Sequence, residues 1–278
     1  MRVVRAKYAG ACYGVQRALN LALAAADDGA CACTLGPLIH NPRVVSELEA
    51  RGIRAVSGVD EAGDGPVIIR SHGVTPQVRR AVEARGLPII DATCPHVARA
   101  QRAAAELAGS CACVVVVGEA GHPEVEGLVA YAREAGGQVL VAAAPQDLPP
   151  EVPAPTGVVV QTTQSRAVFD GVVAELRRRG GPLSVRDTVC FATTQRQESA
   201  AELARTADAI VVIGGRNSSN TTRLAEICAE ACPNTHHIED VEELSAAWFE
   251  GCDLVGVTAG ASTPDDQIQA VVSRLEAL

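Results

Sequence analysis

Aromatic side chains and lysine are scarce in this 278-residue chain. Phe, Tyr and Trp make up 3% of the residues and lysine occurs once, as Lys7, whereas 47% of the residues are hydrophobic. A chain of this length and apolar content can bury real cores. Without aromatic residues, those cores must consist mainly of Ala, Val, Leu and Ile. We attribute the shortage of lysine to a bias in composition rather than to function.

Long hydrophobic runs are also absent. No apolar stretch approaches the roughly 20 residues that span a bilayer. The first ten residues lack the apolar segment of a signal peptide. The sequence therefore predicts a cytoplasmic protein without a membrane segment, in which the ten cysteines serve as thiols or metal ligands rather than as disulfides.

Positive charge is in deficit, and two common motifs are missing. The net charge of −9 argues against a broad surface for nucleic acid or for an anionic membrane. It leaves room for a local anion pocket made of backbone N–H groups, His, Ser and Asn. The lack of a C-x-x-C pair weakens a zinc-ribbon interpretation. The lack of G-x-G-x-x-G removes the usual signature of a bound nicotinamide.

One three-part phrase is repeated three times along the chain. Each copy has a cysteine before a helix-like stretch, then a polar turn before a second helix, then a strand that ends in small polar residues. The same 28-residue spacing separates Cys12 from His40, Cys94 from His122 and Cys190 from Ser218. A period near 90 residues is too long for a solenoid. The repeat predicts three related α/β units whose cysteines could surround one centre.

Short apolar runs alternate with longer amphipathic ones, which is typical of βαβ units with parallel sheets. The strand candidates are residues 67–70, 89–90, 113–117, 158–161, 209–213 and 254–257, and helix-like stretches include 44–51, 125–135 and 221–231. We expect units at residues 1–94, 95–189 and 190–278, with residues 1–12 as candidates for packing with the third unit. Ligands of such sheets bind at the carboxyl ends of strands, beside helix N-termini.

Three of the ten cysteines stand apart because they occupy matching turns. Cys12, Cys94 and Cys190 each precede a helix-like stretch, and a helix N-terminus stabilises the thiolate that ligates metal. The alternative is three buried thiols in similar cores. With no fourth equivalent, a metal or iron–sulfur site would keep one position open for chemistry. We interpret the other seven as packing residues, namely Cys31, Cys33, Cys111, Cys113, Cys228, Cys232 and Cys252.

A second recurring set is rich in hydrogen-bond donors beside predicted helix N-termini. It comprises His40, His72, Ser218, Ser219, Asn220 and Ser262. Any one of them alone would be interpreted as a helix cap or a turn residue, but their recurrence in register suits a phosphate or diphosphate. Glu124, two residues after His122, is either a carboxylate that complements the helix dipole or an acid.

The marked residues belong to motifs that run in order along essentially the whole chain. They are C-Y-G-V-Q-R-A from Cys12, His40-Asn41, S-H-G-V around His72, D-A-T-C-P around Cys94, G-H-P-E-V-E-G around Glu124, Q-T-T-Q-S around Thr162, A-T-T-x-R-Q after Cys190, N-S-S-N around Ser218, and T-A-G-A-S around Ser262. In these motifs the sequence resembles the 4-hydroxy-3-methylbut-2-enyl diphosphate reductases, the LytB family. The resemblance implies a trefoil of three related α/β units with small, mostly parallel sheets, pseudo-threefold around a central iron–sulfur cluster.

The resemblance also implies an activity and a role for each residue. The activity is reductive dehydroxylation of an allylic alcohol diphosphate to isopentenyl and dimethylallyl diphosphates, the last step of the methylerythritol phosphate pathway. Cys12, Cys94 and Cys190 would ligate one [4Fe–4S] cluster with one open iron, and Glu124 would supply protons. The substrate would contact His40, His72, His122, Thr162, Ser218, Ser219, Asn220 and Ser262. Electrons would come from a ferredoxin or flavodoxin.

The sequence departs from the family pattern at three positions, and two other function classes stay open. Ala11, Gln16 and Arg70 replace residues that we expect to be Phe, acidic and small, respectively, and none is an expected ligand. One alternative is a hydro-lyase whose cluster is only a Lewis acid; it would need no external reductant. The other is an iron–sulfur sensor, against which the acidic charge and the lack of an added DNA-binding segment argue.

Overall fold

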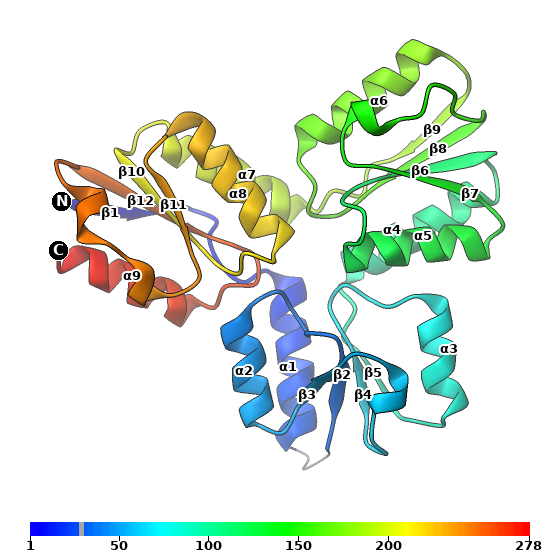
Figure 1. Ribbon diagram of the computed structural model, residues 1–278, viewed down its shortest axis with the longest axis horizontal. Helices are drawn as coiled ribbons and strands as arrows, with labels where there is room; N and C mark the ends of the chain where they lie inside the picture. The colour runs from blue at the N-terminus through cyan, green and yellow to red at the C-terminus, as the bar shows by residue number, and fades with distance from the viewer. Residues whose placement is uncertain (28–30) are drawn as a thin grey trace. The chain divides into compact units, whose positions relative to one another are not determined.

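Strands and helices alternate along the chain in the computed structural model, which describes residues 1–27 and 31–278 (Figure 1). The strands are β1 Arg2–Arg5, β2 Cys33–Leu35, β3 Arg54–Val56, β4 Val67–Ile69, β5 Ile89–Asp91, β6 Cys113–Val117, β7 Gln138–Ala142, β8 Thr156–Val160, β9 Leu183–Arg186, β10 Ala209–Ile213, β11 Thr235–Ile238 and β12 Leu254–Ala259. The helices are α1 Tyr13–Asp27, α2 Pro42–Ala50, α3 Pro76–Ala84, α4 Pro95–Ala108, α5 Pro123–Glu134, α6 Arg166–Arg179, α7 Phe191–Ala204, α8 Ser219–Ala231 and α9 Asp265–Glu276. Short 3₁₀ turns lie at Val59–Glu61, Pro145–Asp147, Val241–Glu243 and Ala246–Phe249.

The three parallel sheets share one strand order. They run β3-β2-β4-β5, β7-β6-β8-β9 and β11-β10-β12-β1. In the third sheet, β1 takes the edge place beside β12 that β5 and β9 take beside β4 and β8. The first strand of the chain therefore completes the sheet of the last copy. The α/β class with small parallel sheets, expected from the sequence, is confirmed.

The expected strands and helices are present, with small differences at their ends. The predictions for 113–117 and 209–213 coincide with β6 and β10. Strand β4 ends at Ile69 rather than at residue 70, and β8 ends at Val160 rather than at 161. The chain turns away from the sheet at these points because the N–H of Gly73 donates to the Arg70 carbonyl and that of Gln164 donates to the Gln161 carbonyl, and the functional motifs begin there.

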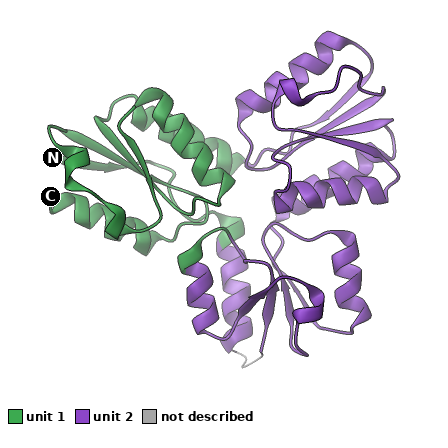
Figure 2. Ribbon diagram, in the orientation of Figure 1, with its two compact units in different colours: residues 1–15, 40–43, 191–278 green, residues 16–39, 44–190 purple. Residues whose placement is uncertain are grey.

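The chain divides into two compact units (Figure 2). Unit 1 consists of Met1–Val15, His40–Arg43 and Phe191–Leu278, and it contains the sheet of β1, β10, β11 and β12. Unit 2 consists of Gln16–Ile39 and Val44–Cys190, and it contains the other two sheets. Unit 1 thus carries Cys12 and His40, and unit 2 carries Cys94 and Cys190. The three sequence-based boundaries stay a prediction.

Aliphatic side chains build the cores, as the scarcity of aromatic residues predicts. Helices α4 and α5 bury Ala100, Ala104 and Leu128 against Val114 and Val116 of β6. Complete burial of a Val or Leu stabilises the fold by about 1.5–3 kcal/mol, and the small alanines let the helix approach the sheet closely. The strand ends are thereby held on a rigid base. Within the described residues, no helix is long and apolar enough to cross a bilayer.

Proline and capping residues fix where the helices begin at the carboxyl edges of the sheets. Pro95 follows Cys94, and Pro123 follows His122, each as the first helical residue. Proline suits this position because its fixed φ is helical and its missing N–H would have no partner within the helix. The polar motifs are therefore held at helix N-termini, as the sequence predicts.

Candidate active site

Each marked cysteine makes the same backbone hydrogen bond. Its N–H donates to the carbonyl of a residue that lies just beyond β4, β8 or β12. The pairs are Cys94 with Ser71 at 2.9 Å, Cys190 with Thr162 at 2.9 Å and Cys12 with Ala261 at 3.0 Å. The three acceptors stand in the same register of the repeat. The bond fixes each cysteine between an edge strand and the helix that follows it.

The chemistry of these positions suits a thiolate-bound metal group. Cys12 lies one residue before α1, Cys94 is the N-cap of α4 and Cys190 lies one residue before α7. Partial positive charge at a helix N-terminus favours the thiolate over the thiol. Thiolates are the ligands that iron–sulfur clusters take in proteins, so the three positions fit such a group.

Several buried cysteines elsewhere in the chain have thiols with raised pKa values. Burial raises the pKa of the Cys33 and Cys113 thiols, and it raises that of Cys228 to about 12. These side chains lie in β2, β6 and α8, where they pack in hydrophobic clusters or beside them. A thiol that stays protonated at neutral pH is a poor ligand, which agrees with a packing role.

Glu124 is a buried carboxyl group bound to a single residue. Its side chain lies in the first turn of α5 and is 1% exposed. Oε1 accepts from the backbone N–H of Thr162 at 2.6 Å, and Oε2 accepts from the Thr162 hydroxyl at 2.9 Å. The Thr162 carbonyl accepts from Cys190, so the carboxyl group is one residue removed from a marked cysteine. Glu126, on the same helix, is exposed.

Burial raises the pKa of Glu124 to about 7, although the two hydrogen bonds from Thr162 oppose this shift. An ionised carboxylate loses its hydration in such a place, and the neutral form is favoured. A carboxyl group with a pKa near the working pH is suited to general acid catalysis. The helix-capping alternative does not account for a carboxyl group withdrawn from water.

His122 is held as a neutral imidazole. Its Nδ1 accepts the backbone N–H of Glu124 at 3.1 Å, so in the neutral ring the proton is on Nε2. Burial, together with the positive charge of Arg70, lowers the pKa of His122 to about 4. The ring of His72 meets that of His122 edge-on, with centroids 5.6 Å apart. The Nε2–H of His122 is thus a neutral donor for an anion.

Unit 1 carries its own set of donors at the start of α8. Ser218 is the N-cap, and its hydroxyl accepts from the Thr221 N–H at 3.4 Å. Asn220 is 4% exposed, yet neither Oδ1 nor Nδ2 has a hydrogen-bond partner among the described residues. A buried amide without partners is destabilising by about 1–3 kcal/mol. A bound ligand would remove that penalty.

Ser262 and the His40–Asn41 turn are joined within unit 1. The Ser262 hydroxyl donates to the His40 carbonyl at 3.0 Å. Asn41 is buried, and its Nδ2 donates to the Ser262 carbonyl at 3.0 Å and to Oε1 of Gln267 at 3.1 Å. Sequence reasoning marked Asn41 as a motif residue but gave it no role; the structure makes it the residue that positions His40 and Ser262.

Gln101 is a second residue that the sequence did not mark. It is buried in α4, and its Nε2 has no hydrogen-bond partner among the described residues. Gly73 of the S-H-G turn has φ +71°, and a Cβ there would lie 2.5 Å from Nε2 of Gln101. The glycine of this motif therefore serves both the turn and the close approach of α4.

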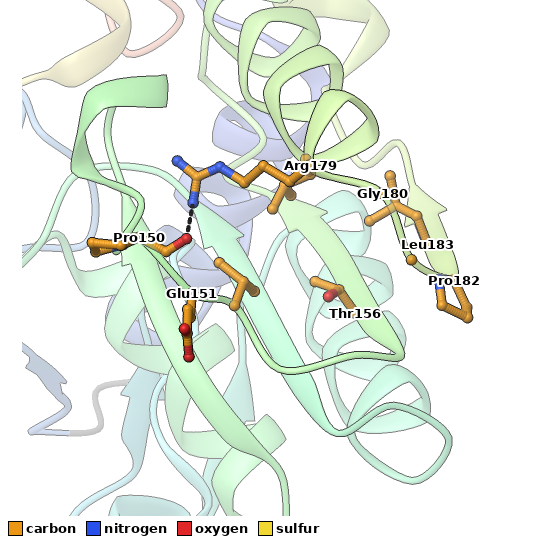
Figure 3. A pocket seen from close by; sticks show the side chains of 10 residues that line it. Pro150, Glu151, Thr156, Arg179, Gly180, Pro182 and Leu183 are labelled. Carbon is orange, nitrogen blue, oxygen red and sulfur yellow. Dashed lines mark hydrogen bonds between the residues drawn. The ribbon is translucent and has the colours of Figure 1, made fainter.

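A cavity of about 340 Å³ lies away from these residues (Figure 3). Its lining includes Thr156 and Leu183, at the amino ends of β8 and β9, whereas Thr162 follows the carboxyl end of β8. Arg179 crosses the cavity and donates to the Pro150 carbonyl at 3.4 Å. Ligands of parallel sheets bind at the carboxyl edge, so this cavity does not belong to the candidate site.

Comparison with protein families places the chain in a known group. The family model described as "LytB protein" matches residues 3–276. The chain is 48% identical over 278 residues to the 4-hydroxy-3-methylbut-2-enyl diphosphate reductase of Pelobacter propionicus, covering 99% of this chain and 98% of that protein. It is 47% identical over 278 residues to the enzyme of the same name from Geobacter sulfurreducens, covering 99% and 97%.

Solved structures agree with this result. The structure of an (E)-4-hydroxy-3-methyl-but-2-enyl diphosphate reductase, titled the terminal enzyme of the non-mevalonate pathway, matches with a TM-score of 0.72 and 41% identity over 100% of both chains. The E-1-hydroxy-2-methyl-but-2-enyl-4-diphosphate reductase from Plasmodium falciparum matches with a TM-score of 0.90 over 98% of this chain and 86% of that one. Its identity of 24% shows the shared fold alone.

Proposed function

The chain belongs to the LytB family, and on that basis we propose that it is a 4-hydroxy-3-methylbut-2-enyl diphosphate reductase. The enzyme removes the hydroxyl group of (E)-4-hydroxy-3-methylbut-2-enyl diphosphate and forms isopentenyl and dimethylallyl diphosphates. The observation that carries this proposal is Glu124, a buried acid with a pKa of about 7 in contact with the Thr162 hydroxyl. Loss of a hydroxyl group as water needs such a proton donor.

Cys12, Cys94 and Cys190 are the proposed ligands of one [4Fe–4S] cluster. Support comes from their matched places before helices and from the identical backbone hydrogen bond that each one makes. When bound, the cluster supplies the electrons of the reduction and one iron without a thiolate ligand that acts as a Lewis acid. The chain has no fourth cysteine in this register.

Glu124 and Thr162 handle the proton in the proposed reaction. Cleavage of the allylic C–O bond consumes two electrons and two protons and releases water. Protonated Glu124 gives one of these protons to the departing oxygen, which leaves better as water than as hydroxide. We assign to the Thr162 hydroxyl, which is hydrogen-bonded to Oε2 of Glu124, the contact with the substrate hydroxyl. Both side chains are buried, so bulk water does not compete.

The diphosphate of the substrate is the proposed ligand of the donor set. In unit 1 these donors are His40, Ser218, Ser219, Asn220 and Ser262, and in unit 2 they are His72 and His122. The partnerless amide of Asn220 and the Nε2–H of His122 support this role. Holding the diphosphate fixes the allylic carbon relative to the reacting groups, which is a contribution of positioning.

Electrons come from outside the chain in this proposal. The sequence has no G-x-G-x-x-G for a bound nicotinamide. We assign the role of donor to a ferredoxin or a flavodoxin in the cytoplasm. Each delivers electrons singly, which suits an iron–sulfur acceptor.

Turnover by anaerobically purified protein tests the proposal. We expect the protein with a reduced viologen to convert the allylic diphosphate into the two isoprenoid diphosphates, detected by mass spectrometry. Addition or removal of water, giving a hydrated or dehydrated product without any reductant, would identify a hydro-lyase instead. Cys94→Ser should lose iron or activity, whereas Cys228→Ser, a packing thiol, should keep both. Full iron and turnover in Cys94→Ser would refute the ligand assignment.

A further inference from the structure

Arg70 is the residue just beyond β4, two positions before His72, and its guanidinium rests on a glycine. Gly36, just beyond β2, has φ +73°. A Cβ at Gly36 would lie 2.6 Å from Nη1 and 3.4 Å from Cζ of Arg70. The two strands are neighbours in unit 2. Only a residue without a side chain allows the guanidinium to lie at this edge of the sheet.

This guanidinium has no partner in the part of the chain that the structure describes. Its Nε is buried and makes no hydrogen bond, and no ion pair or hydrogen bond joins Arg70 to a described residue. Arg80, on α3, by contrast holds Glu134 through two hydrogen bonds of 2.9 Å. Arg70 is half-buried, and its Nε is withdrawn from water. Partial burial of a cation without a counter-ion is unfavourable, so a bound anion would stabilise this position.

The charges around Arg70 do not supply that anion. Burial lowers the pKa of Arg70, and Glu126 is the one carboxylate that opposes this effect. Glu126 is exposed, so its field is screened by water. The charge of Arg70 instead reaches His122, whose pKa it helps to lower. Arginine stays protonated even when partly buried, so a fixed positive charge stands beside the two histidines.

We propose that Arg70 is a further ligand of the substrate's diphosphate and a source of permanent positive charge in that site. This inference rests on the proposed function and extends it. The other proposed ligands are imidazoles, hydroxyls and an amide, and His122 is neutral. A diphosphate carries several negative charges, and neutral donors alone leave them uncompensated. The planar fork of a guanidinium can bind two phosphate oxygens at once.

The position also has a consequence for selectivity. A fixed cation favours the diphosphate over a monophosphate because the diphosphate carries more negative charge, and over a neutral alcohol because the alcohol carries none. Lysine at residue 70 would keep the charge but lose the fork. The sequence departure at Arg70 thus alters the binding site, although the residue is not one of the ligands expected from the family resemblance.

Calorimetric titration of the anaerobic holoenzyme with inorganic diphosphate and with inorganic phosphate tests this inference. Arg70→Met should weaken diphosphate binding by about ten- to a hundredfold, the usual scale for a charge-assisted hydrogen bond, and should affect phosphate less. Arg70→Lys should lose part of that affinity. In turnover, Arg70→Met should raise KM and leave kcat close to that of the parent. Arg80→Met removes an equal charge from an exposed ion pair and should bind as the parent does.

The outcomes separate this inference from the function it rests on. If the parent reduces the substrate and Arg70→Met and Arg70→Lys both bind diphosphate as the parent does, Arg70 is not a ligand. If Arg70→Met is poorly folded, Arg70→Lys decides: unchanged affinity for diphosphate would overturn the inference. If the parent binds diphosphate through Arg70 but reduces no substrate, the anion site stands and the proposed reaction fails.

Discussion

Glu124 and Asn220 occupy the same register of the repeat and have opposite surroundings. Each lies 30 residues after a marked cysteine and within the first turn of a helix, and each is nearly fully buried. Both carboxyl oxygens of Glu124 accept hydrogen bonds from Thr162. Neither polar atom of the Asn220 side chain has a partner among the described residues.

The two copies also differ in the residue whose carbonyl accepts the N–H of the marked cysteine. The acceptor of the Cys190 N–H is Thr162, whose hydroxyl also reaches Glu124. The matching acceptor for Cys12 is Ala261, which has no hydroxyl to offer. In the copy that contains Glu124, both carboxyl oxygens are thus paired, and burial favours the protonated form. In the copy that contains Asn220, the side-chain amide has no partner among the described residues and is available to a ligand. The repeat gives both copies the same backbone arrangement, and the different side chains at matching positions give them different chemistry.

The largest expected effect is on turnover. Glu124→Gln keeps the volume and the burial of Glu124 but cannot donate a carboxyl proton, so we expect kcat to fall by about a hundredfold or more. Binding of inorganic diphosphate, measured by calorimetry, should stay near that of the parent. Glu126→Gln, on the exposed side of the same helix, is the control and should turn over normally. Normal turnover by Glu124→Gln would leave the residue a helix-end carboxylate.

Stability against pH tests the protonation of Glu124. Its pKa is raised from 4.5 to about 7 in the folded chain. The amount that this group adds to the free energy of unfolding is therefore fully present below pH 4.5 and is lost as the pH rises through about 7. At about 1.4 kcal/mol per pKa unit, the parent should lose about 3 kcal/mol relative to Glu124→Gln across that window. Denaturant unfolding at several pH values measures it; parallel curves for the two proteins would contradict the shift.

Asn220→Ala tests whether the unpaired amide of Asn220 binds the substrate. If the amide binds the diphosphate, its loss should weaken diphosphate affinity by about tenfold and change kcat little. Asn217→Ala, at an exposed position three residues earlier, is the matched control. A gain in stability of Asn220→Ala without loss of affinity would show that the buried amide is merely unsatisfied.

The smallest expected effect comes from the hydroxyl of Thr162. Thr162→Val removes one of the two hydrogen bonds that lower the pKa of Glu124, so the alkaline limb of the rate profile should move to higher pH. Turnover should fall by about tenfold or less, the scale of one neutral hydrogen bond. Thr163→Val removes a hydroxyl that accepts from Gln161 rather than contacting Glu124 and should leave the limb in place. An unmoved limb in Thr162→Val would separate Thr162 from the acid.

Most of the fold could be predicted from the sequence because the strands and the starts of helices are marked by patterns among neighbouring residues. The apolar runs at 113–117 and 209–213 became β6 and β10, and proline after Cys94 and His122 marked the first residues of α4 and α5. The candidate site could be predicted from the repeat register, which placed Glu124 beside His122. Gln101 was missed, and Asn41 was marked only as a motif residue without a role, because a buried asparagine or glutamine has no periodic pattern.

The sequence by itself determined the α/β class, the threefold repeat, the family and the residue types of the site. These depend on spacing and hydrophobic period, which can be read along the chain. Tertiary structure decided that β1 closes the sheet of the last copy, that Thr162 holds both oxygens of Glu124 and that burial raises the pKa of this acid to about 7. It also decided that Arg70 stands unpaired over Gly36. Burial and long-range pairing depend on which distant residues remove water from a group, and no local pattern in the sequence encodes them.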